Sequence, residues 1–305
     1  MRAPELVDSA LVSQADGNLI AWLGAGAGGA ETLGGKGASL DRLARLGFRI
    51  PPGFCLTTAA FRAQLEASPI PAGGADTAVR LAAAPLERGL AEALGGAVER
   101  LATDVRAATG AEPRFAVRSS ALGEDGSAAS YAGLHDTELD VPPDGIAASV
   151  GRCWASLWSP AAVAYRARRG LPADDAAMAV VVQALVPADA AAVVFTRHPV
   201  TGRADQLVIT AVRGLGDAMV SGTVTPDTWV IDRASRSVAG FDPGEDPRGA
   251  ALDGPALAEL VELSLAVEAR FGQPVDIEAA MALRTWYLLQ ARPITTGAPT
   301  RAAGA

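Results

Sequence analysis

The chain has 305 residues, 50% of them hydrophobic, and a net charge of −8. This length is enough to bury a substantial core in roughly two domains or lobes. The negative charge argues against a nucleic-acid or anionic-membrane surface. Two cysteines are too few for a disulfide framework or a zinc site, and we find neither a signal peptide nor an apolar run long enough to span a bilayer. We therefore expect a cytoplasmic protein.

The N-terminal third shows helical periodicity, separated by glycine- and proline-rich breaks. The pattern first predicts a flexible glycine-rich loop at 24–29 and a helix that follows Gly34–Gly37 and stops near Gly47. After a break at 50–53, it predicts a second helix from about Ala59, capped by Thr57 or Thr58. A surface loop at 68–77 and a helix over 78–108, interrupted at Gly95–Gly96, follow.

From Arg114 onward, predicted strands and helices are mixed. Arg114–Arg118 alternates like a strand, and a loop of small residues is expected from Ser119 to Gly133. Further strands are expected at 137–141, 178–186, 192–196, 206–211 and 228–231, helices at 147–157, 161–169 and 255–271, and a final hairpin at 275–280 and 286–291. The pattern predicts an α+β fold with a lobe boundary near Pro187.

Two short segments have the residue types that bind phosphate. Gly34-Gly35-Lys36-Gly37 is expected to open a helix, where free amides attract anions and Lys36 adds a positive charge. Arg118-Ser119-Ser120 offers a guanidinium, hydroxyl groups and amides to a polyphosphate. Each segment also has an alternative explanation. Lys36 would be a solvated lysine at a helix start, and Arg118 would be a surface arginine paired with Glu124 or Asp125.

The C-terminal hairpin carries polar residues on one face of each strand. Asp276 and Glu278 share a face of the first strand, and Gln290 and Arg292 share a face of the second. If the turn centres on Arg284, Glu278 lies opposite Gln290. A carboxylate beside an amide oxygen suits Mg²⁺, and Arg292 would reach a phosphate on the same metal. The alternative is an edge hairpin with a hydrated polar face.

Further short motifs accompany these segments along the chain. They are Leu33-Gly-Gly-Lys-Gly-Ala-Ser-Leu40, Ile50-Pro-Pro-Gly-Phe54, Phe115-Ala-Val-Arg-Ser-Ser-Ala121, Ser130-Tyr-Ala-Gly133, Val181-Val-Gln183, Phe195-Thr196, Pro199-Val-Thr-Gly202, Gly214-Leu-Gly216, Ser221-Gly222, Asp276-Ile-Glu278 and Leu289-Gln-Ala-Arg-Pro293. In this order they resemble the N-terminal ATP-binding domain of the pyruvate phosphate dikinase, phosphoenolpyruvate synthase and rifampicin phosphotransferase family. The resemblance implies an ATP-grasp fold with the nucleotide between two lobes, residues 1–186 and 187–296, followed by a disordered tail at 297–305.

The resemblance also implies a role for each matching position. Phosphates are bound by Lys36, Arg118 and Arg292, with Ser119 and Ser120 in the phosphate segment; Mg²⁺ is ligated by Glu278 and Gln290; the adenine of ATP is held through backbone groups around Gln183, Ala184 and Leu185. In the family, this domain transfers the ATP β-phosphoryl group to a histidine on a swivelling domain and releases AMP. Catalysis then depends mainly on positioning and on electrostatic stabilisation of the transferred group.

Several positions depart from the family's pattern. Leu122 stands where threonine is frequent, Gly123 replaces alanine, and Gly126-Ser127 replaces Leu-Pro, which should make the phosphate loop more flexible. His198 and Asp217 replace aspartate and glutamate. We expect these changes to affect loop geometry and rate more than nucleotide binding.

The chain contains two histidines, His135 and His198, and neither lies in the Thr-Ser-His-Ala context of the family's phosphorylated histidine. We therefore expect the ATP-binding subunit of a split dikinase, with the phosphorylatable histidine and the acceptor-binding domain on a separate partner protein. Two alternatives stay open. One is a kinase or ligase that uses ATP directly on a small molecule and releases ADP, and the other is a nucleotide-binding regulatory subunit without turnover.

Overall fold

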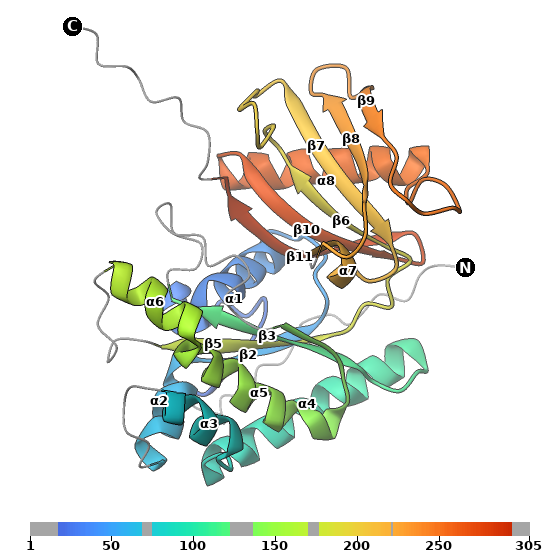
Figure 1. Ribbon diagram of the computed structural model, residues 1–305. Coiled ribbons are helices and arrows are strands. Elements are labelled where there is room, and N and C mark those ends of the chain that lie inside the picture. Colours follow the sequence, from blue (N-terminus) through green and yellow to red (C-terminus); the bar gives the residue numbers. More distant parts are fainter. Residues whose placement is uncertain (1–17, 69–74, 123–136, 170–176, 221, 295–305) are drawn as a thin grey trace, which may run out of the picture. The chain divides into compact units, whose positions relative to one another are not determined.

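The computed structural model describes residues 18–68, 75–122, 137–169, 177–220 and 222–294 (Figure 1). The chain forms two compact units, one made of Met1–Arg45 with Pro51–Leu185, the other of Leu46–Ile50 with Val186–Ala305. Each unit has its own sheet, and all neighbouring strands are antiparallel. The prediction of a mixed α and β fold is confirmed.

The first unit is built on a five-stranded sheet. Its strands, in spatial order, are β1 (Ile20–Trp22), β2 (Gly53–Leu56), β5 (Met178–Ala184), β3 (Phe115–Ala121) and β4 (Thr137–Val141). Its helices are α1 (Ala30–Arg45), α2 (Thr58–Ala67), α3 (Ala75–Ala83), α4 (Arg88–Thr109), α5 (Ile146–Ala155) and α6 (Pro160–Arg169), with short 3₁₀ turns at Pro143–Gly145 and Ser156–Trp158.

The two faces of this sheet are covered differently. Phe115 and Val117 of β3 belong to the hydrophobic core that α2, α3, α4 and α5 close from one side. On the other side lies α1, which packs against β3 and β5 (Figure 1). Because side chains alternate along a strand, Ala116, Arg118 and Ser120 of β3 face α1.

The second unit has a six-stranded sheet. Its strands, in spatial order, are β11 (Thr285–Pro293), β10 (Val275–Ala282), β6 (Ala190–Phe195), β7 (Gln206–Arg213), β8 (Asp227–Asp232) and β9 (Val238–Asp242). The helix α8 (Gly254–Phe271) crosses one face (Figure 1), where the indole of Trp286 donates to the Ala256 carbonyl at 3.3 Å. A short helix, α7 (Asp217–Val220), follows β7.

Two helix boundaries differ from the prediction. The helix α1 already begins at Ala30, but a kink at Gly34 divides it, and the predicted helix is its second segment. The predicted break at Gly95–Gly96 is wrong, because α4 continues through it and the break lies just before Arg88. There, the Glu87 side chain accepts hydrogen bonds from the first turn of α4, and Gln64 accepts one from the Glu87 amide. The break before α4 is therefore stabilised by Gln64 of α2, whereas Gly95 and Gly96 do not interrupt the helix.

The strand β3 is longer than predicted. Ser119, Ser120 and Ala121 pair with β5, so they belong to the sheet and not to the following loop. The rest of that predicted loop lies outside the described residues, as do His135, the substitutions Gly123, Gly126 and Ser127, and the tail beyond Thr296. Thr57 is the N-cap of α2, as one of the two predicted caps, with its hydroxyl accepting from the Ala60 amide.

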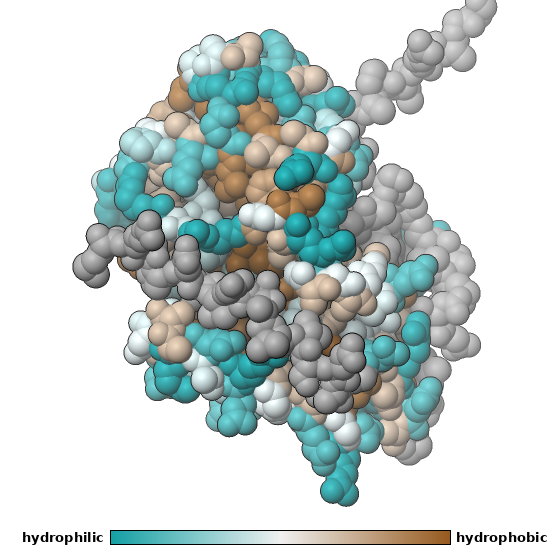
Figure 2. Space-filling view, turned by 180° about the vertical axis from the view of Figure 1, so that it is seen from behind, coloured by the Kyte–Doolittle hydropathy of each residue, from teal (hydrophilic) through white to brown (hydrophobic). Residues whose placement is uncertain are grey.

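Hydrophilic side chains cover much of the surface seen in Figure 2, with hydrophobic residues gathered in part of the second unit. Within the described ranges, no helix combines the length and the apolar composition needed to cross a bilayer.

Candidate functional site

The Gly34–Gly37 segment lies directly against β3. Gly34 has φ 67° and ψ 179°, which interrupts α1 and starts a new helical segment at Gly35. A Cβ atom on Gly34 would lie 2.0 Å from the Ser120 carbonyl oxygen, so only glycine fits. The Ser120 hydroxyl donates to the Leu33 carbonyl at 2.8 Å and accepts from the Gly37 amide at 3.0 Å. The structure thus brings together the two predicted phosphate segments.

Lys36 and Arg118 are held on the α1 side of the first sheet. The Lys36 ammonium donates to the Ser119 carbonyl at 3.1 Å. Each of the two side chains is only 8% exposed. This burial does not fit a solvated lysine, whereas the alternative pairing of Arg118 with Glu124 or Asp125 involves residues outside the described ranges. A buried ammonium and a buried guanidinium are groups that suit the binding of a polyphosphate.

Ser119 differs from its neighbour Ser120. Its side chain points to the core face of β3, where its hydroxyl is buried and has no hydrogen-bond partner among the described residues. Ser119 therefore contributes to this region through its backbone carbonyl.

The strand β5 carries the predicted adenine segment. The Gln183 side chain is buried and donates to the Pro51 carbonyl at 3.0 Å. The amides of Ala184 and Leu185 already donate to the carbonyls of Pro52 and Arg114, at 2.9 and 2.8 Å. Proline has no N–H, so Pro52 cannot return a hydrogen bond to the Ala184 carbonyl. The Ala184 carbonyl is therefore left without a ladder hydrogen bond from Pro52.

The hairpin β10–β11 pairs Glu278 with Gln290, as predicted, but for a different reason. The turn consists of Leu283 and Arg284, both with positive φ, and so centres between these two residues. A regular ladder from this turn would place Leu289 opposite Glu278. Leu289 instead forms a bulge, which shifts the register by one residue.

Asp276 and Arg292 lie opposite each other, one pair along from Glu278 and Gln290. The Arg292 guanidinium contacts one Asp276 oxygen through Nε and Nη2, both at 2.8 Å. Burial raises the pKa of Asp276 above its ordinary value, the Arg292 charge opposes this, and the Glu278 charge adds to it. Since Asp276 and Gln290 are buried, a fully hydrated polar face is excluded.

The chemistry of this face fits Mg²⁺. Glu278 and Gln290 offer a carboxylate and an amide oxygen, both hard ligands, and Mg²⁺ in proteins commonly takes one or two such ligands and completes its shell with water and phosphate oxygens. In the described part of the chain, no three His, Cys, Asp or Glu residues gather as a metal site.

Sequence reasoning missed Asp41, a buried residue of α1. Its Oδ1 accepts from the amides of Gly24 and Gly26, at 2.8 and 3.1 Å. These bonds anchor the glycine-rich loop to the same helix that carries Lys36. A lone aspartate inside a helix gives no signal of this role in the sequence.

Comparison with known proteins identifies the family of the chain. The family described as the pyruvate phosphate dikinase AMP/ATP-binding domain matches residues 30–304. The chain belongs to this family. The resemblance noted from the motifs is thereby confirmed, and the family description supports ATP as the nucleotide.

Relatives include enzymes of several names. Rifampicin phosphotransferase of Streptomyces sviceus is 38% identical over 301 residues, which cover 87% of this chain and 34% of the relative. Prodigiosin synthesizing transferase PigC of Serratia marcescens is 36% identical over 294 residues, which cover 87% of this chain and 32% of the relative. A probable phosphoenolpyruvate synthase of Methanocaldococcus jannaschii is 31% identical over 309 residues, which cover 87% of this chain and 26% of the relative. The chain thus spans about a third or less of these relatives' length.

Proposed function

We propose that this chain binds Mg-ATP and transfers its β-phosphoryl group to a histidine of a separate partner protein, with release of AMP and with the γ-phosphoryl group leaving as orthophosphate after attack by water. The phosphorylated histidine then passes the group to a small acceptor. The observation that carries the proposal is the hairpin β10–β11, where Glu278 faces Gln290 and Asp276 holds Arg292 on the same face. Membership of an AMP/ATP-binding family supports the choice of nucleotide.

The nucleotide is bound, in this proposal, in an ATP-grasp arrangement to which both units contribute. Lys36 and Arg118 of the first unit and Arg292 of the second bind the phosphates. The Ala184 carbonyl accepts from the adenine amino group, since its neighbour Pro52 leaves it without a return hydrogen bond. Glu278 and Gln290 hold Mg²⁺.

Charge stabilisation is the main catalytic contribution of these residues. The transferred phosphoryl group carries negative charge on its peripheral oxygens, which fixed cations stabilise without reorganisation. Arg292 is held in place by Asp276 and Lys36 by the Ser119 carbonyl, so both are already oriented. Bound Mg²⁺ would neutralise further phosphate charge.

The nucleotide product tests the reaction. The chain is mixed with Mg-ATP and a candidate partner that carries a Thr-Ser-His-Ala segment, and products are separated by ion-exchange chromatography. We expect AMP only when the partner's histidine is intact. ADP, or AMP that forms equally with a histidine-to-alanine partner, would favour direct transfer to a small molecule. Saturable ATP binding without any turnover would favour a regulatory subunit.

Two substitutions test the assignment of the site. Arg118→Ala and Glu278→Gln should each lower the rate of AMP formation by at least about 100-fold, because each removes a charge that acts on the phosphates or the metal. Arg203→Ala and Glu262→Gln are matched controls, since these residues form exposed ion pairs elsewhere in the chain. Near-wild-type rates in both site variants would refute the assignment.

A further inference from the structure

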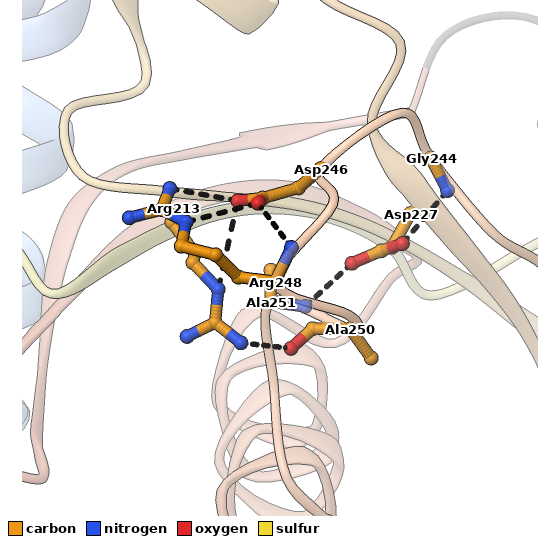
Figure 3. Close-up of polar contacts among 7 residues, drawn as sticks. All are labelled: Arg213, Asp227, Gly244, Asp246, Arg248, Ala250 and Ala251. Atoms are coloured by element: carbon orange, nitrogen blue, oxygen red, sulfur yellow. Dashed lines mark hydrogen bonds and ion pairs between the residues drawn. The ribbon is translucent and has the colours of Figure 1, made fainter.

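The second unit contains a cavity of about 520 Å³ that the proposed nucleotide site does not use. It lies where β7 ends and β8 begins, beside the loop that follows β9 (Figure 3). Its lining combines apolar residues and threonines with two arginines, Arg213 and Arg248, and three acids, Asp227, Glu245 and Asp246. A volume of this size accepts a small organic molecule.

Two guanidinium groups in this lining share one carboxylate. Arg248 contacts both oxygens of Asp246, through Nε at 2.9 Å and Nη2 at 2.8 Å. Arg213 places Nε 3.6 Å from the same carboxylate and donates from Nη2 to the Ala250 carbonyl at 2.6 Å. The two arginines lower the pKa of Asp246 to about 2, so it stays ionised. The group of three side chains keeps one net positive charge.

Both arginines have donor capacity left. In the described ranges, Nη1 of neither arginine has a hydrogen-bond partner. In Figure 3, these two amino groups point to the same side, away from Asp246. The other acid in the close-up, Asp227, is buried and accepts from the amides of Gly244 and Ala251 at 2.7 and 2.5 Å. The Asp227 carboxylate is therefore hydrogen-bonded by backbone amides of the loop.

We propose that this cavity binds a small organic monocarboxylate. Its carboxylate would lie between the free amino groups of Arg213 and Arg248, and its apolar part against Val212, Val224 and Pro247. A planar carboxylate matches the geometry of guanidinium donors well. The exposed Glu245 at the same cavity opposes negative charge on the ligand, and it opposes a phosphate dianion more strongly than a monocarboxylate.

Benzoate is a suitable probe, because it joins one carboxylate to an apolar ring. Isothermal titration of the full chain should show saturable binding of benzoate, with the neutral isostere benzamide and the dianion phenyl phosphate each binding at least about tenfold more weakly. Equal binding of benzamide, tighter binding of phenyl phosphate, or no saturable binding of benzoate would each overturn the proposal.

Variants locate the site. Arg248→Gln should weaken benzoate binding about tenfold and Glu245→Gln should tighten it, while Glu278→Gln should leave it unchanged. Arg203→Gln is the matched control, since Arg203 makes the same two-bond contact to an aspartate two residues away, but outside the cavity. Thermal unfolding establishes that each variant is folded. Unchanged benzoate affinity in folded Arg248→Gln would refute the site.

Discussion

Ser119 and Ser120 are neighbours in β3, but their hydroxyl groups lie on opposite sides of the sheet. Ser120 joins β3 to the kink in α1 through two hydrogen bonds. Ser119 is completely buried on the core side, and its hydroxyl has no partner within the described residues. The same residue type is thus an essential link at one position and an energetic cost at the next.

Alanine substitutions should separate the two serines. Ser120→Ala leaves the Gly37 amide and the Leu33 carbonyl without their partner, which should lower the free energy of unfolding by about 1–3 kcal/mol. Ser119→Ala removes an unsatisfied buried hydroxyl and should be neutral or stabilising by up to about 1 kcal/mol. Urea denaturation measures both. A loss of stability in Ser119→Ala as large as in Ser120→Ala would contradict this orientation.

Gly34 and Gly47 provide a second matched comparison. Both have positive φ, at 67° and 85°, but a Cβ atom would clash only at Gly34. Gly47→Ala should therefore cost about 1 kcal/mol of stability from backbone strain alone. Gly34→Ala should cost more than about 3 kcal/mol, because the Ser120 backbone must also move. Thermal or urea unfolding of the two variants gives the difference, and equal costs would argue against the close approach.

At the scale of elements, a side-chain cluster attaches α5 to the edge strand β4. Glu138 of β4 accepts from Arg152 through both oxygens, each at 2.6 Å, and from the Ser149 hydroxyl at 2.7 Å. The hydrogen bonds from Arg152 hold the pKa of Glu138 below its ordinary value, with burial opposing and Ser149 helping. A carboxyl with a lowered pKa stabilises the fold above its unfolded-state pKa, and this contribution disappears as pH falls through the folded-state pKa.

Glu138→Gln should show this dependence on pH. At pH 7 the variant should be less stable than wild type by about 1 kcal/mol, a modest figure because Arg152 is half exposed. The difference should shrink as pH falls below about 4, since the wild-type carboxyl then becomes protonated. Glu92→Gln removes an exposed ion pair and should have little effect at either pH. A stability difference that is constant with pH would rule out the proposed cause.

The hairpin β10–β11 shows how elements compensate for unfavourable residues. Its two-residue turn uses Leu283 and Arg284 at positive φ, where Asn and Gly are preferred. Arg284 makes two hydrogen bonds to Asp253, the residue that also caps α8. The Leu283 amide donates to Asp189 at 2.9 Å. Contacts from other elements therefore hold a turn that its own residues do not favour.

At the scale of the whole molecule, nucleotide binding should stabilise the fold. A ligand that binds only the folded state at 100 times its Kd adds about 2.7 kcal/mol. We expect Mg-ATP to raise the unfolding midpoint, and EDTA to remove most of that effect, because in the proposed site a metal links Glu278 and Gln290 to the phosphates. Differential scanning fluorimetry measures both conditions. An ATP-dependent shift that is the same with and without EDTA would contradict a metal-dependent site.

Local patterns in the sequence predicted much of the candidate site. Glycines around Lys36, the arginine and serines at the end of a strand, and the alternation of polar residues in the last hairpin are all short-range signals. The short strands β1, β2 and β9 were missed, because runs of three to five residues show no clear periodicity. Their pairing depends on partners that only the folded chain brings close.

The sequence by itself determined the family, the mixed α and β character, and which residue types are available to bind phosphate and metal. Only the tertiary structure decided which of these residues lie side by side and which of them are buried. It placed Ser120 beside Gly37, 83 residues away in sequence, and buried Lys36 and Arg118. It also paired Glu278 with Gln290 through a bulge at Leu289. The physical reason is that burial and strand register are set by contacts between distant segments, whereas residue type and periodicity are local.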